Sequence, residues 1–216
     1  MPRPSVGHIY AQGAARHGFR IPPQEIEKLF KKTWKKYGGL RTLLPADGTN
    51  QKASEKAWWE RFVRETMEPF KMGRHFDDFF DALYKIFEYE KSWRVFPDVE
   101  KTLSSLKTKG FRLGVISNWD SRLIPLLKRL DLSRFFDKII VSSKIGAAKP
   151  NPAIFRKAAR LLRQNPEGCL HVGNDLEEDY RGALRAGFSA VLLNRTGKSP
   201  GRNVQIRSVS ELCRII

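Results

Sequence analysis

The sequence contains few cysteines, no long apolar run and no continuous basic block. Only Cys169 and Cys213 occur among its 216 residues. Two isolated cysteines give neither a disulfide framework nor a zinc site, and they suit a reducing compartment. No stretch of about 18 apolar residues is present, so no membrane span is predicted. The first residues also lack the apolar segment of a signal peptide, and we therefore expect a cytoplasmic protein.

The net charge is strongly positive, at +17, but the basic residues are spread along the whole chain. The densest basic stretch, residues 31–36, lies within a helical pattern. A basic chain raises two alternatives to an ordinary solvated surface, namely direct nucleic-acid binding and attraction of anionic phosphorylated substrates. The even spread of charge favours the solvated surface over both. The sequence does not indicate an oligomeric state.

The first ninety or so residues show the apolar spacing of helices. One predicted helix begins near Gln24, a second near Ser54, and a third covers residues 76–87. Aromatic side chains recur on the inner faces of these helices, and aromatics at this spacing form bundle cores more often than ligand sites. We therefore predict a small antiparallel bundle, a helical cap domain at residues 1–92.

After Trp93, short apolar runs alternate with helical patterns. Such alternation predicts βαβ units, a parallel sheet and right-handed crossovers. We therefore predict an α/β fold in which residues 93–216 form a Rossmann-like core domain. The predicted strands are residues 111–118, 138–143, 169–173 and 190–193.

In parallel α/β sheets, ligands bind beyond the carboxyl ends of the strands. Ser117 and Asn118 follow the first predicted strand, where they offer a hydroxyl, an amide and backbone N–H groups to an anion. Such a pair is also a common helix cap. Lys149 stands before a proline in a rigid turn, where it presents a fixed positive charge to a phosphate or is one more surface lysine.

Acidic residues follow the strand at residues 169–173. Asp175 and Asp179 are four residues apart and share one face if the helix has begun there. Acids in the first turn of a helix stabilise it through the helix dipole, which is the simpler interpretation. The alternative is a magnesium site, because Mg²⁺ prefers oxygen ligands.

These three clusters, in this order, resemble motifs of the haloacid dehalogenase-like hydrolases. Residues 115–118 resemble the second motif of that family, residues 148–150 the third and residues 171–179 the fourth. The helical segment before Trp93 is similar to the C1-type cap of the family, which is inserted after the first motif. The resemblance extends over the whole chain.

The resemblance implies phosphoryl transfer with Mg²⁺ as cofactor. In the family a strand-end aspartate attacks phosphorus, and water hydrolyses the aspartyl-phosphate. By motif match, Ser117 and Asn118 would bind the phosphoryl oxygens, and Lys149 would be catalytic by stabilising the nucleophile and the transferring charge. Asp175 and Asp179 would hold the metal. The fourth motif usually has an acid directly after its glycine, whereas here that residue is Asn174, which is left as a neutral ligand.

The chain shows no counterpart of the first motif, an Asp-x-x-x-Thr at the end of a strand before the cap. Residues 5–10 already look like the first cap helix. The missing strand would lie between those ending at Asn118 and Gly173, and each buried unpaired backbone group there would cost about 1–3 kcal/mol. We expect that the flanking strands close directly, that a strand comes from elsewhere, or that the chain begins downstream of its true start. We favour the last.

Three functions follow from these patterns. The main hypothesis is a magnesium-dependent phosphatase for a small phosphorylated metabolite, represented here without its nucleophile strand. The alternative is a non-catalytic relative that binds an anionic partner such as RNA, and the third is a haloacid dehalogenase. The acidic fourth motif argues for a metal and so for phosphate chemistry. His171 is expected in the core, and Trp119 in ordinary packing rather than at a substrate pocket.

Overall fold

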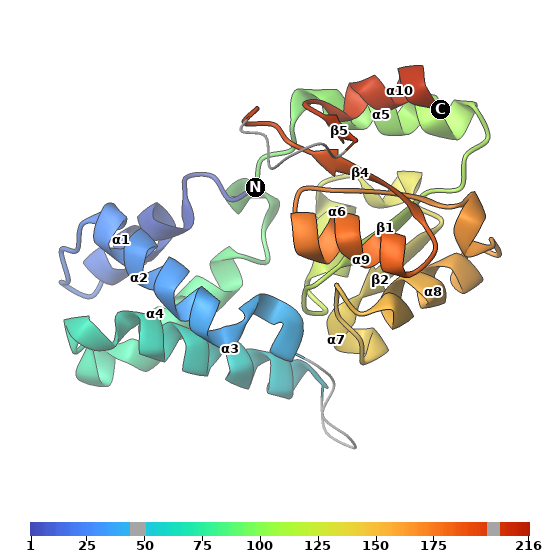
Figure 1. Cartoon of the computed structure of the whole chain (residues 1–216). Helices are drawn as coiled ribbons and strands as arrows, with labels where there is room; N and C mark the ends of the chain where they lie inside the picture. Colours follow the sequence, from blue (N-terminus) through green and yellow to red (C-terminus); the bar gives the residue numbers. More distant parts are fainter. Residues whose placement is uncertain (44–50, 198–203) are drawn as a thin grey trace.

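The computed structural model describes residues 1–43, 51–197 and 204–216, and it has a mixed α/β fold. Four helices come first and lie together on one side of the molecule, whereas all the strands lie on the other (Figure 1). No helix among the described residues is long and apolar enough to cross a membrane. These first helices, called the bundle below, are α1 (Val6–Ala15), α2 (Pro23–Tyr37), α3 (Gln51–Met67) and α4 (Phe76–Ile86).

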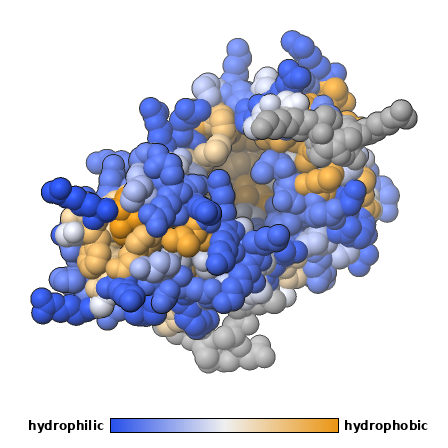
Figure 2. Space-filling view, turned by 60° about the vertical axis from the view of Figure 1, so that its left-hand side comes forward, coloured by the Kyte–Doolittle hydropathy of each residue, from blue (hydrophilic) through white to orange (hydrophobic). Residues whose placement is uncertain are grey.

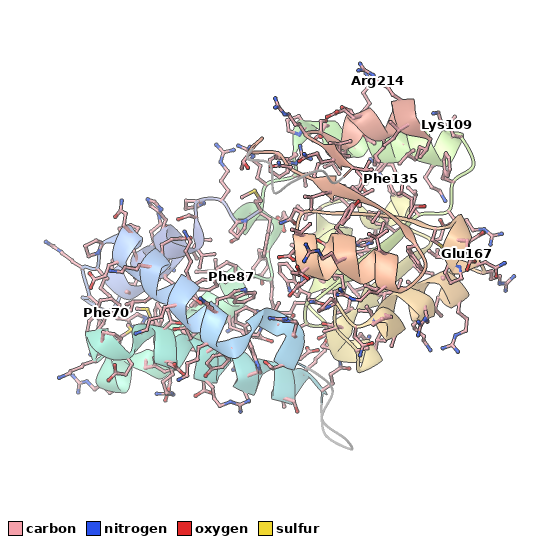
Figure 3. The ribbon with its side chains drawn as sticks, viewed as in Figure 1. Phe70, Phe87, Lys109, Phe135, Glu167 and Arg214 are labelled. Atoms are coloured by element: carbon pink, nitrogen blue, oxygen red, sulfur yellow. The ribbon has the colours of Figure 1, made fainter. Side chains whose placement is uncertain are left out.

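The bundle is held together by aromatic side chains, as the helical spacing predicts. Phe62 is fully buried, and its ring contacts those of Phe30 and Trp34 at centroid distances of 5.1 and 5.7 Å. Such edge-to-face pairs add to the free energy from burial. Phe87, labelled in Figure 3, lies where the bundle faces the strands, and its ring contacts that of Trp93 at 6.1 Å.

Strands and helices alternate after the bundle. Each of the four predicted strands is present, and a two-residue strand that the sequence pattern did not indicate follows them. The strands are β1 (Gly114–Ser117), β2 (Lys138–Val141), β3 (Leu170–Gly173), β4 (Ser189–Leu193) and β5 (Gln205–Ile206). The helices are α5 (Pro97–Thr108), α6 (Leu123–Arg129), α7 (Ser142–Ile145), α8 (Pro152–Leu161), a π-helical turn (Leu176–Arg181), α9 (Gly182–Arg185) and α10 (Leu212–Ile215).

The second strand ends two residues earlier than predicted. Ser142 and Ser143 begin the short helix α7 instead of continuing β2. The Ser142 hydroxyl explains the change, because it accepts a hydrogen bond from the backbone N–H of Trp119 at 3.1 Å and contacts the Trp119 carbonyl. A side chain bonded to the backbone in this way competes with the strand ladder.

The strands form two separate parallel sheets. β1 pairs with β2, and β3 pairs with β4, which pairs with β5. Within the described residues no strand lies between β1 and β3, and these two do not pair with each other. Direct closure of the flanking strands, one of the three expected outcomes, is therefore not observed.

The strands beside this break are less buried than their outer neighbours. β1 and β3 have no fully buried residue, whereas Ile140 in β2 is 1% exposed and Leu192 in β4 is 2% exposed. On one face, Val115 of β1 and Val172 of β3 pack into different apolar clusters. On the other face α8 bridges the break, because it packs on β1 while its Phe155 ring lies 5.1 Å from the His171 ring of β3.

Asp98, at the start of α5, holds the C-terminal residues in place. Its carboxylate accepts two hydrogen bonds from Arg195, at 2.9 and 3.1 Å, and others from the Ser208 hydroxyl and the Val209 N–H. Burial alone would raise the pKa of Asp98, but these bonds outweigh it and lower the pKa to about 2. They fix the position of α10, which lies beside α5 (Figure 1).

Replacing Asp98 with asparagine should lower the free energy of unfolding by about 2–3 kcal/mol at pH 7. The carboxylate contributes stability above its unfolded pKa of about 4, and this contribution is lost as the pH falls towards 2. Urea denaturation at several pH values checks both points. In the exposed control, Asp131→Asn, we expect a loss below about 1 kcal/mol; an equal loss in the two variants would contradict the interpretation.

Candidate active site

Asn118, directly after β1, joins two other segments at the carboxyl ends of the strands. Its side-chain oxygen accepts the backbone N–H of Lys149 at 2.7 Å, and its amide nitrogen donates to the Lys149 carbonyl at 2.9 Å. The same nitrogen donates to Glu178 at 3.0 Å. The neighbouring Ser117 hydroxyl makes no hydrogen bond in the part of the chain that the structure describes.

Lys149 is buried and pairs with Asp179. Its Nζ donates to Asp179 Oδ1, and the lysine is only 9% exposed. His171 Nε2 lies 3.2 Å from the same oxygen, so the histidine expected in the core belongs to this cluster. Burial would raise the pKa of Asp179, but His171 and the Lys149 charge hold it well below its usual range. Asp179 is therefore a carboxylate at neutral pH.

Gly173 makes room for this arrangement. A Cβ at that position would lie 2.2 Å from Asp179 Cγ, so only glycine allows the carboxylate to fold back over the end of β3. The Asp179 Oδ2 then accepts the backbone N–H of Asp175 at 3.0 Å. Both oxygens of Asp179 are thus hydrogen-bonded within the protein.

Asp175 caps the π-helical turn that follows. Its Oδ1 accepts the N–H groups of Glu177 and Glu178 at 2.9 and 2.7 Å, as the helix-start interpretation expects. Burial, and then the charge of Asp175, raise the pKa of Glu178. Asn174 and Asp175 are exposed.

Among the described residues, no group of three or more His, Cys, Asp or Glu side chains is arranged to hold a metal ion. The oxygens of Asp179 are occupied by Lys149, His171 and a backbone N–H. Asp175 Oδ2 and the Asn174 amide make no hydrogen bond within these same residues, and both are oxygen-bearing groups open to solvent. They fit Mg²⁺, which is commonly held by one or two carboxylates together with several waters.

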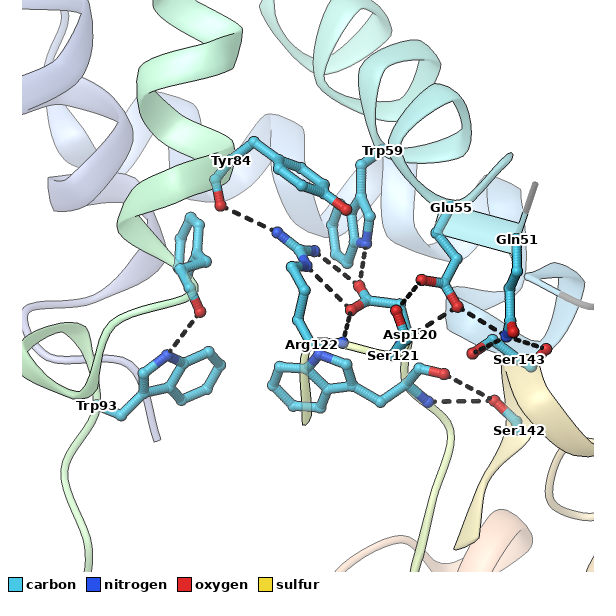
Figure 4. Close-up of polar contacts among 12 residues, drawn as sticks. Gln51, Glu55, Trp59, Tyr84, Trp93, Asp120, Ser121, Arg122, Ser142 and Ser143 are labelled. Carbon is cyan, nitrogen blue, oxygen red and sulfur yellow. Dashed lines mark hydrogen bonds and ion pairs between the residues drawn. The ribbon is translucent and has the colours of Figure 1, made fainter. Parts of the chain in front are cut away.

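A second polar cluster connects the bundle to the strand side (Figure 4). Asp120 is fully buried and accepts hydrogen bonds from Arg122 Nη2 at 2.7 Å and from Trp59 Nε1 at 2.6 Å. Glu55, 2% exposed, accepts the N–H and hydroxyl of Ser121. Sequence reasoning missed Glu55, Trp59 and Arg122; the one available signal is a charged residue on the otherwise largely apolar inner face of α3.

A cavity of about 280 Å³ lies between the bundle and the strands. Figure 2 shows this hollow, with apolar walls, between the two parts of the molecule. Aromatic and aliphatic side chains from the bundle form most of its wall, and Asn118, Trp119 and Arg122 line the strand side. Trp119 therefore borders a pocket as well as packing in the core.

Residues 4–187 match the family model of the haloacid dehalogenase-like hydrolases. The chain belongs to this family. Haloacid dehalogenase-like hydrolase domain-containing protein 3 of Homo sapiens is 32% identical over 193 residues, which are 88% of this chain and 76% of that protein. A glyceraldehyde 3-phosphate phosphatase of Methanothermobacter thermautotrophicus is 44% identical over 107 residues, which are 47% of this chain and 45% of the enzyme.

The fold of this haloacid dehalogenase-like hydrolase is that of solved relatives. The crystal structure of YfnB from Bacillus subtilis, bound to magnesium, matches with a TM-score of 0.69 and 16% identity. The match covers 96% of this chain and 91% of that one. The predicted α/β class with a parallel core and a helical part is confirmed.

The structure brings the predicted site residues of this hydrolase together at the carboxyl ends of β1 and β3. Lys149 is hydrogen-bonded to both Asn118 and Asp179, and the backbone N–H of Asp175 donates to Asp179. Ser117 precedes Asn118 at the end of β1, and Asn174 follows the end of β3. The roles of these residues in binding phosphate and metal remain predictions.

Proposed function

We propose that this hydrolase is a magnesium-dependent phosphatase that acts on a small phosphorylated metabolite. The observation that carries the proposal is the meeting of Asn118, Lys149 and Asp179 at the carboxyl ends of β1 and β3. An ammonium group and an amide at this edge suit the oxygens of a phosphate. The acidic residues beside them favour a metal, and so favour phosphate chemistry over dehalogenation. The likeness of half the chain to a phosphatase supports the same choice.

In this proposal Ser117 and Asn118 bind the phosphoryl oxygens. The Ser117 hydroxyl is available, whereas both amide hydrogens of Asn118 are engaged by Lys149 and Glu178. Asn118 would therefore release Glu178 when it binds a phosphoryl oxygen.

Lys149 supplies a positive charge that is already held in position by Asp179. A charge fixed before the substrate arrives needs no reorganisation during the reaction. Asp175 would hold Mg²⁺, with Asn174 as a neutral ligand and Asp179 acting through water. The metal, when bound, would neutralise negative charge on the phosphoryl oxygens.

Hydrolysis needs a nucleophile, which the family resemblance expects on a strand between β1 and β3. We propose that such a strand, ending in an aspartate, completes the site next to Lys149. Phosphate binding and hydrolysis are then separable, because binding requires only the residues named above.

Binding of inorganic phosphate in the presence of magnesium, measured by isothermal titration calorimetry, tests the first part. Lys149→Met should weaken binding at least tenfold, because a hydrogen bond to a charged group contributes about 1.5–3 kcal/mol. Ser117→Ala, which leaves the Lys149–Asp179 pair intact, should weaken binding severalfold. Lys128→Ala, an exposed lysine on α6, is the matched control and should bind as the unaltered chain does.

Hydrolysis of para-nitrophenyl phosphate tests the second part. This chain is compared with the same chain preceded by an apolar strand that ends in Asp-x-x-x-Thr, and we expect activity only in the longer form. If neither form binds phosphate, and this chain is instead retained on RNA in a salt-sensitive way, the non-catalytic alternative is favoured.

A further inference from the structure

We infer that the cavity between the bundle and the strands takes an uncharged, apolar group of about two aromatic rings, carried by the phosphate ester that binds at Lys149. The inference rests on the proposed function for the phosphate half of the ligand. The apolar half rests on the size, wall and charge of the cavity.

The size of the cavity indicates the size of the group. Its volume is about 280 Å³. An apolar cavity of about 150 Å³ stays dry and binds benzene. A volume close to twice that value suits two rings rather than one, or a branched aliphatic group of similar bulk.

The wall is largely aromatic and includes the hydroxyl of a buried tyrosine. Phe30, Trp34 and Phe80 line the bundle side. Tyr10 also lines the cavity and is 1% exposed, yet its hydroxyl makes no hydrogen bond among the residues that the structure describes. A ligand with a single polar substituent on its rings would give this hydroxyl a partner.

The charges around the cavity exclude an ionised group on the apolar half of the ligand. Arg122 is the only charged side chain in the described lining, and its guanidinium is already satisfied. Two of its nitrogens donate to Asp120, the third donates to the Tyr84 carbonyl, and the guanidinium lies 3.8 Å from the centre of the Tyr84 ring. A carboxylate brought into the cavity would lose its water and find no free cation, which is strongly unfavourable.

Asn118 connects the cavity to the phosphate site. It is part of the cavity lining, and it is also hydrogen-bonded to Lys149 and Glu178. One molecule can therefore place its phosphate at Lys149 and its apolar group against the bundle. Glycerol phosphates and sugar phosphates would leave the aromatic wall without a partner.

Calorimetric titration of the full chain with four probes tests the inference: 1-naphthyl phosphate, 1-naphthol, glycerol 3-phosphate and inorganic phosphate. We expect 1-naphthyl phosphate to bind at least tenfold more tightly than glycerol 3-phosphate. Val6→Phe, which fills the cavity, should weaken 1-naphthyl phosphate and 1-naphthol at least tenfold and leave inorganic phosphate unchanged. Val209→Phe makes the same exchange at a partly buried valine of another cluster and is the control.

The outcomes separate this inference from the proposed function. Equal affinity for 1-naphthyl phosphate and glycerol 3-phosphate would overturn the inference and leave the phosphate site standing. Binding of 1-naphthol that V6F abolishes, without any binding of inorganic phosphate, would support the cavity and contradict the phosphatase. If circular dichroism shows that V6F does not fold, Val6→Leu fills less of the cavity and replaces it, with the same expected order of affinities.

Discussion

Replacing Lys149 with methionine is expected to lower the free energy of unfolding by about 3–5 kcal/mol, because the change leaves a buried carboxylate without its cation. The side chain of Asp179 is 7% exposed and has Lys149 as its only lysine or arginine partner among the described residues. Methionine keeps the bulk of the side chain, so the loss reports charge rather than a cavity. Urea denaturation followed by circular dichroism at pH 7 measures it.

A double-mutant cycle separates the ion pair from its surroundings. Lys149→Met together with Asp179→Asn should be less destabilised than the sum of the two single variants, because no isolated charge then remains. Losses that simply add would show that the two side chains do not interact.

The ion pair also predicts the pH dependence. The pKa of Asp179 lies well below its usual range, so its stabilisation is complete above its unfolded pKa of about 4 and is lost progressively as the pH falls from there through the folded pKa. The unaltered chain should therefore lose stability in strong acid more steeply than the Lys149→Met variant.

The second large effect is expected for Asp120→Ala, which should cost about 3–5 kcal/mol. The change leaves the Arg122 guanidinium, whose side chain is 11% exposed, without its carboxylate. It also removes the acceptor of the Trp59 Nε1 hydrogen bond, which crosses from the bundle to the strand side (Figure 4). The same denaturation assay measures the loss, and tryptophan emission reports the change around Trp59.

Asp77→Ala is the matched control for this prediction. Asp77 also pairs with an arginine, but its side chain is 83% exposed, and such pairs contribute about 1 kcal/mol or less. Similar losses in the two variants would contradict the argument that burial of Arg122 makes Asp120 important.

The meeting of Lys149 with Asp179 could be predicted from sequence, because both residues follow predicted elements whose ends share one edge of a parallel sheet. The place of His171 could not. Its position in a strand suggested the core, and its contact with Asp179 depends on the absence of a side chain at Gly173, which lets the Asp179 carboxylate fold back over the end of β3. The role of Asp175 could be predicted in part, because capping depends on local sequence and was one of the two interpretations of the acidic stretch.

The contacts between the bundle and the strand side could not be predicted from the sequence, for a different reason. Trp59 and Asp120 are 61 residues apart, and Glu55 and Ser121 are 66 apart. No local spacing links such residues, and a buried glutamate on a helix resembles any other polar residue until its partner is known. These same long-range contacts set the volume of the cavity and pair its charged lining residue, Arg122, with Asp120.

The break between β1 and β3 has a consequence for how copies of this chain behave together. A strand edge without a neighbour is a template for pairing with another polypeptide, and unprotected edges promote aggregation. The net charge of +17 opposes this, because like-charged molecules repel one another. Salt at about 1 M shortens the range of that repulsion to roughly 3 Å, so colloidal stability in this molecule depends on ionic strength as long as the two edges stay open.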